Sequence, residues 1–102
     1  MLINEYTPCR ISECYMVGTD GVEISNLNGT IFLNGAGSIV WGLLDGKHTI
    51  KTIVQYLSNE LNIGDYKTVH EEVISLLKVL QQKKFIIANW DPLYKFELNQ
   101  EL

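Results

Sequence analysis

The chain has 102 residues, of which 46% are hydrophobic, and a formal net charge of −4, which suits one globular domain and does not fit a disordered chain. The eight basic residues are scattered among twelve acidic ones, so the charge does not favour binding to nucleic acid. No apolar run approaches the roughly 20 residues of a membrane span, and the N-terminus lacks the features of a secretory signal, so we expect a cytoplasmic protein with no membrane contact.

The cysteines and histidines predict no metal site and no local disulfide. Cys9 and Cys14 are five residues apart on an expected extended segment, so their side chains point to opposite faces. His48 and His70 belong to different segments and provide no local ligand set for zinc. We find no nucleophile beside a base and no phosphate-binding loop. We therefore expect a protein that is not an enzyme and that uses no cofactor.

The first third of the chain predicts an antiparallel meander of three strands. Residues 11–17 are rich in β-forming side chains and precede a turn cluster at 18–21. A second strand over 22–27 is expected in the middle of the sheet, followed by a tight hairpin turn at Asn28 and Gly29. Residues 30–33 then return as the third strand, at the other edge.

This third strand contains neither a charged residue nor a proline, although one of the two commonly protects an edge strand. Two explanations are open. A helix or the C-terminal tail covers the edge, or the edge is kept open so that an extended peptide can add a fourth strand.

A short helix is expected directly after the third strand. Asn34 is a good N-cap residue, and Asp45 with Gly46 is typical of a helix end. Between them, apolar residues recur at helical spacing at Ile39, Val40, Leu43 and Leu44.

Two longer helices follow. Thr49 is expected to cap a helix that ends at 62–64, and Asp65 to cap a helix that runs to about Lys84. The apolar positions of the first are Ile50, Ile53, Val54, Leu57 and Leu61.

The last helix carries two neighbouring stripes. At about 100° per residue, the expected core stripe consists of Tyr66, Val69, Val73, Leu76 and Leu80. A mixed stripe beside it consists of His70, Ile74, Leu77 and Gln81. The mixed stripe either forms the wall of a groove or packs against the sheet or the tail.

The C-terminal part begins with an apolar run at 85–88 that is consistent with a last strand. Apolar residues at every second position, Tyr94, Phe96 and Leu98, then indicate a further strand, a packed tail or a contact for a partner enzyme. We divide the chain into a lead-in at 1–9, a domain at 10–88 and a C-terminal extension at 89–102.

The order of elements and several short motifs resemble the PqqD-like family over residues 10–87 or so. The family comprises small peptide-binding domains also called RiPP recognition elements. The matching positions are Leu33-Asn34, Ile39, Trp41, Leu44-Asp45-Gly46, Thr49-Ile50, Ile53, Val69, Val73, Leu76, Leu77, Leu80 and Phe85-Ile86. Two positions depart from the family pattern, since Glu72 replaces a usual aspartate and Lys84 a usual glycine.

The resemblance implies an α+β, winged-helix-like fold, with a three-stranded antiparallel sheet followed by three helices. It also implies binding of the leader region of a ribosomally made precursor peptide, which lies as an added strand in the cleft between the third strand and the third helix. The partner would be a modifying enzyme, such as a radical SAM enzyme or a lasso leader peptidase and cyclase. The expected peptide-binding residues are Thr30, Ile31, Phe32, Leu33, His70, Val73, Ile74, Leu77, Lys78 and Gln81.

The main alternative is a winged-helix DNA-binding regulator with the third helix in the major groove. That function requires basic and amide side chains on the exposed face of the helix. Here the face offers mainly Lys67, Lys78 and Lys83 beside Glu71 and Glu72.

Overall fold

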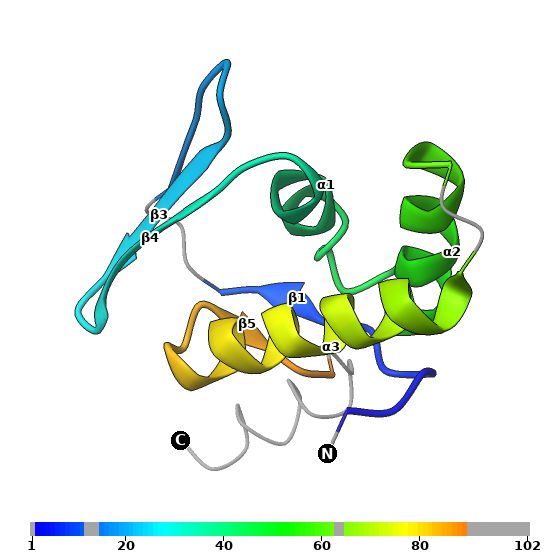
Figure 1. Cartoon of the computed structure of the whole chain (residues 1–102). Coiled ribbons are helices and arrows are strands. Elements are labelled where there is room, and N and C mark those ends of the chain that lie inside the picture. The colour runs from blue at the N-terminus through cyan, green and yellow to red at the C-terminus, as the bar shows by residue number, and fades with distance from the viewer. Residues whose placement is uncertain (1, 12–14, 63–64, 90–102) are drawn as a thin grey trace, which may run out of the picture.

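Two antiparallel sheets and three helices form the part of the chain that the computed structural model describes, residues 2–11, 15–62 and 65–89 (Figure 1). The larger sheet has the strand order β2-β3-β4 and precedes the three helices, which confirms the expected α+β class. The smaller sheet pairs β1 with β5. The strands are β1 (Cys9–Arg10), β2 (Tyr15–Val17), β3 (Val22–Asn26), β4 (Gly29–Leu33) and β5 (Ile86–Ile87).

The strands differ from expectation at three points. The predicted strand at 11–17 is shorter, because only β2 forms in its described part; residues 12–14 lie outside the described residues. β1 was not predicted, because residues 1–9 were interpreted as a lead-in; it pairs with β5, the last strand expected within 85–88. The β3–β4 turn comes one residue early: Asn26 pairs with Gly29, so Leu27 and Asn28 form the two-residue loop.

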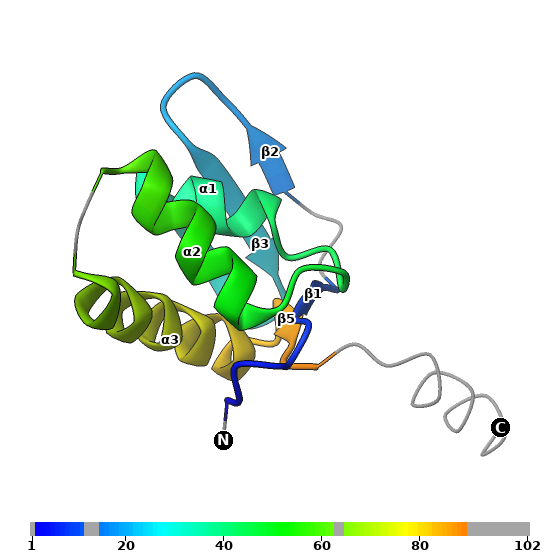
Figure 2. The ribbon, with the colours of Figure 1, turned by 90° about the vertical axis from the view of Figure 1, so that its right-hand side faces the viewer.

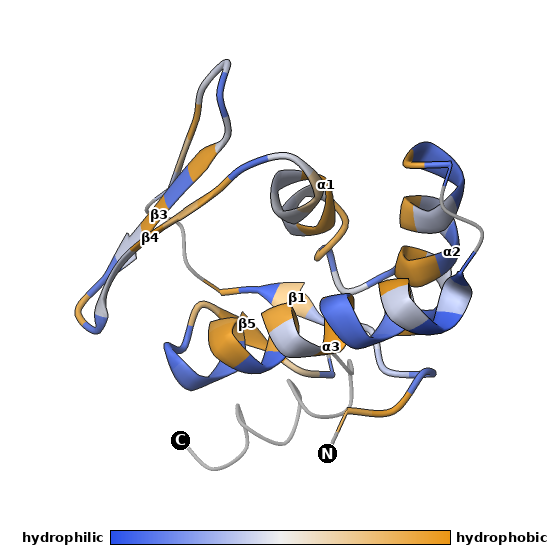
Figure 3. Cartoon of the chain, viewed as in Figure 1, coloured by the Kyte–Doolittle hydropathy of each residue, from blue (hydrophilic) through white to orange (hydrophobic). Residues whose placement is uncertain are grey.

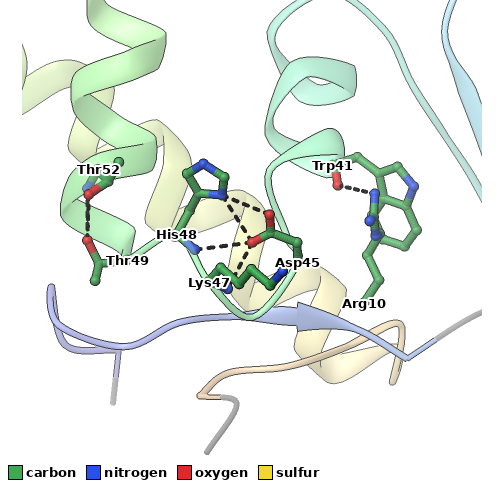
Figure 4. Close-up of polar contacts among 7 residues, drawn as sticks. All are labelled: Arg10, Trp41, Asp45, Lys47, His48, Thr49 and Thr52. Carbon is green, nitrogen blue, oxygen red and sulfur yellow. Dashed lines mark hydrogen bonds and ion pairs between the residues drawn. The ribbon is translucent and has the colours of Figure 1, made fainter.

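The helix α1 (Ala36–Gly42) begins and ends differently from the prediction. Its N-cap is Gly35, which has a φ of 51°, and no side chain caps the helix, so the expected cap at Asn34 is wrong. A positive φ here costs glycine little because it has no Cβ. The helix ends at Gly42, before Asp45, and Arg10 donates from Nη1 to the Trp41 carbonyl at 3.1 Å (Figure 4). A cation at this end of the helix complements its dipole.

The predicted N-caps of the two longer helices are confirmed. The Thr49 side chain accepts from the Thr52 N–H at the start of α2 (Ile50–Glu60). The Asp65 side chain accepts from the Thr68 N–H at the start of α3 (Tyr66–Gln82). The helix α2 ends earlier than the predicted end at 62–64, because its last residue is Glu60 and Leu61 is its C-cap. Residues 63 and 64 lie outside the described residues.

The hydrophobic core lies where the helices meet the inner face of the larger sheet (Figures 1 and 3). Its fully buried side chains come from β3, the three helices, the connection between α1 and α2, and the segment before β5. The largest are Trp41, Phe85, Ile24, Leu44, Ile50, Ile53, Leu77 and Leu80. Within the described residues, no helix is long and apolar enough to cross a membrane.

Replacing Lys84 with glycine is expected to raise the free energy of unfolding by about 0.5–1 kcal/mol. Lys84 follows the C-cap of α3 with a φ of 63°, a left-handed conformation that costs an L-residue with a Cβ more than it costs glycine. Chemical denaturation measures the change. Lys78→Gly, in the interior of the same helix, is the control and should instead lose about 1 kcal/mol; equal losses in both variants would contradict the explanation.

Asp45 is expected to stabilise the fold down to acidic pH. Partial burial would raise the pKa of Asp45, but the Lys47 and His48 N–H groups and the His48 ring, 2.9 Å away, lower it from 3.8 to about 2 (Figure 4). Because the folded pKa lies below the unfolded one, this stabilisation is complete above about pH 4 and is lost as the pH falls towards 2. Asp45→Asn should therefore cost about 1 kcal/mol at pH 7 and much less at pH 2, as measured by denaturation at each pH.

Candidate functional site

Within residues 2–11, 15–62 and 65–89, the outer side of β4 is an unpaired sheet edge. Paired residues in an antiparallel ladder alternate between exchanging two backbone hydrogen bonds and exchanging none. The tight loop makes Gly29 a bonded position, and Ile31 and Leu33 follow at every second residue. The backbone N–H and C=O groups of Thr30 and Phe32 therefore point away from β3. Among the described residues, no strand pairs with this side of β4, which we call the open edge.

The open edge lies on the same side of the molecule as α3. The sheet order places β4 and β2 at opposite edges, and Figure 2 shows β2 on the side of the sheet away from α3. Apolar residues run along β4 towards the segment that leads into α1 (Figure 3). A chain that paired with β4 would therefore lie beside α3.

The side chains of β4 are divided between the two faces of the sheet. Ile31 and Leu33 are partly buried and pack against the core, on the face of their cross-strand partners Ile24 and Val22. Phe32 lies on the opposite face, is 56% exposed and pairs with Glu23. The Phe32 side chain therefore lies on the face of the sheet away from the core, although its backbone belongs to the open edge.

Two sets of contacts fix the two ends of β4. At the hairpin end, the side-chain amides of Asn26 and Asn28 donate to the Lys83 carbonyl at 2.7 and 3.2 Å. At the other end, Leu33 lies beside Gly37, where a Cβ would come within 3.4 Å of the leucine Cβ. The start of β4 thus lies at the C-terminal end of α3, and its other end lies beside α1.

An apolar hollow of about 220 Å³ lies between the three helices, next to the Leu33 end of β4. This volume is below that of sites for drug-sized ligands, about 300–1,000 Å³, and suits a single side chain. We call it the helix hollow. Its lining residues are Ala36, Gly37, Val40, Leu57, Glu72, Val73 and Leu76.

The two flanks of α3 have different neighbours. His70 donates from Nε2 to Asn4 Oδ1 at 2.8 Å, so the flank of α3 that carries His70 lies beside the N-terminal lead-in and not beside β4. Ile74 and Gln81 follow His70 along the same flank. At 100° per residue, Glu72 and Leu76 lie on the opposite flank, and these are the residues that line the helix hollow.

Two neighbouring leucines of α3 have the reverse of their expected roles. Leu77, expected in the mixed stripe, is fully buried in the core. Leu76, expected in the core stripe, is only partly buried and lines the helix hollow. Of the other predicted site residues on α3, Val73 is buried at the hollow, whereas Lys78 and Gln81 are exposed.

A larger cavity, of about 530 Å³, lies between β2, the β2–β3 turn and α1. Arg10, Tyr15 and Trp41 contribute to its lining. The Arg10 guanidinium lies 5.8 Å from the Tyr15 ring centroid and 5.9 Å from that of Trp41. Because Arg10 also binds the last turn of α1, this cluster has a structural role. The cavity contains no residue of β4.

The described residues contain no group of three or more histidine, cysteine or acidic side chains arranged to hold a metal ion.

The chain is similar to a known protein family: the family model described as "Coenzyme PQQ synthesis protein D (PqqD)" matches residues 14–86. The matched segment contains the larger sheet, the three helices, the open edge and the helix hollow. No curated protein and no solved structure matches the chain significantly.

Proposed function

The chain belongs to the PqqD family, the family of RiPP recognition elements, and on this premise we propose that it binds the leader region of a ribosomally made precursor peptide as a strand added to the open edge. The protein then delivers the peptide to a modifying enzyme and catalyses no step itself. That enzyme is of the radical SAM class or a lasso leader peptidase and cyclase.

The observation that carries this proposal is the pair of outward-facing residues on β4. Thr30 and Phe32 together offer two N–H donors and two C=O acceptors to an extended chain. Each such hydrogen bond contributes about 0.5–1.5 kcal/mol and depends little on the peptide's side chains. Selectivity then has to come from side-chain contacts, and the helix hollow lies at one end of the open edge to provide them.

The proposed contact residues differ in part from the set predicted from the sequence. The backbones of Thr30 and Phe32 bond the peptide, and the inward side chains of Ile31 and Leu33 contact it. On α3 the contacts come from Glu72, Val73 and Leu76. The proposed contact set no longer includes five residues of α3, since one is buried in the core and the others lie on other faces of the helix. The buried residue is Leu77, and the others are His70, Ile74, Lys78 and Gln81.

Hydrogen exchange tests the proposal directly. A synthetic leader peptide, from a precursor to be sought among the short open reading frames next to this gene, should slow amide exchange at Thr30 and Phe32, and a peptide of the same composition in scrambled order should not. β2 is the internal control, because it is the other edge of the same sheet. Slower amide exchange at Tyr15–Val17 with no change at Thr30 and Phe32 would show that the peptide binds at β2, and would contradict the proposal.

A further inference from the structure

We propose that the peptide recognised at the open edge carries an apolar anchor residue for the helix hollow and, two positions away, a lysine or arginine that pairs with Glu72. The inference rests on the proposed function and adds the class of peptide that this chain selects. It follows from the composition of the hollow, the position of one carboxylate at it and the geometry of an added strand.

Glu72 is the one charged residue among those that line the hollow. The other lining residues are alanine, glycine, valine and leucine, so an apolar side chain can enter without leaving a polar group unpaired. Glu72 itself is exposed to solvent, which places its carboxylate at the mouth and not in the depth of the hollow.

The carboxylate of Glu72 has no cationic partner among the described residues. The one ion pair within 4 Å in that part of the chain joins His48 and Asp45. The positions three and four residues away on α3 are occupied by Thr68, Val69, Ser75 and Leu76, none of which is basic. A cation from a bound peptide would therefore meet an unpaired carboxylate.

The spacing follows from the alternation of side chains on a strand. In a strand paired with β4, every second side chain points to the same face as Ile31 and Leu33. When one of these side chains fills the hollow, the next on that face is two residues away. A lysine or arginine there has the length to reach back to Glu72 at the mouth.

Glu71 provides a matched control. It is also an exposed glutamate of α3, but it lies about 100° around the helix from Glu72 and is absent from the lining of the hollow. Reversing either charge changes the net charge of the protein equally. A difference between the two variants thus reports the position of the charge.

The experiment measures binding of designed peptides with a leucine anchor and, two positions before or after it, either lysine or glutamate. For the better lysine peptide, Glu72→Lys should weaken binding about fivefold at low salt, and Glu71→Lys should change it less than about twofold. The glutamate peptide should bind Glu72→Lys better than it binds the parent protein. This rescue shows that the variant is folded and measures the coupling of the two charges.

Equal effects of the two reversals, or no preference for lysine over glutamate, would overturn the inference while protection at Thr30 and Phe32 still upheld the proposed function. If no peptide binds or protects these amides, neither the designed peptides nor the synthetic leader, the proposed function fails as well.

Discussion

Replacing Phe32 with proline is expected to weaken peptide binding about ten- to a hundredfold while the domain stays folded. The Phe32 N–H points away from β3, so proline removes a donor that the fold does not use. A bound peptide then loses one hydrogen bond and leaves a carbonyl unpaired, which costs about 1–3 kcal/mol. Calorimetric titration with the leader peptide measures the loss, and far-UV circular dichroism checks the fold.

Two neighbouring substitutions separate the backbone effect from side-chain and folding effects. Phe32→Ala keeps the N–H and removes a side chain on the opposite face, so it should bind the leader nearly as well as the parent protein. Ile31→Pro removes a donor that bonds to β3, so it should instead destabilise the sheet. If Phe32→Ala weakens binding as much as Phe32→Pro, the peptide lies on the outer face and not along the open edge.

Truncating Leu76 and Leu77 is expected to give opposite results although the two residues are adjacent. Leu77→Ala creates a cavity in the core and should lower the free energy of unfolding by about 2–5 kcal/mol. Leu76→Ala should cost only about 1 kcal/mol, because Leu76 is partly exposed at the helix hollow.

Leader binding should be weakened more by Leu76→Ala than by Leu77→Ala, the reverse of their effects on the free energy of unfolding. Leu76→Ala removes a wall of the hollow and should weaken leader binding about tenfold, whereas the folded fraction of Leu77→Ala should bind nearly normally. Denaturant unfolding and titration at a temperature where both variants are folded separate the effects. A loss of binding in Leu77→Ala with none in Leu76→Ala would place the peptide on the other flank of α3.

The sequence by itself determined the strands of the larger sheet, a last strand within 85–88 and the three helices, but not β1. Local signals are sufficient for these: β-forming residues around turns, and the side-chain oxygens of Thr49 and Asp65 at two helix starts. A β4 without charge or proline left two explanations open, a covering segment or an added strand. The small errors were also local, since the helix cap fell on Gly35 instead of Asn34 and the hairpin turned one residue early.

Only the tertiary structure decided which side chains face the open edge. On a helical wheel the two flanks of the core stripe of α3 are equivalent, so periodicity cannot distinguish Leu76 from Leu77 as the residue that borders the site. The contact of His70 with Asn4 and the place of Glu72 at the hollow make that distinction, and both join residues far apart in the chain. Similarly, a shift of one residue inverts every side chain of a strand, and the observed pairing of β3 with β4 put Phe32 outside.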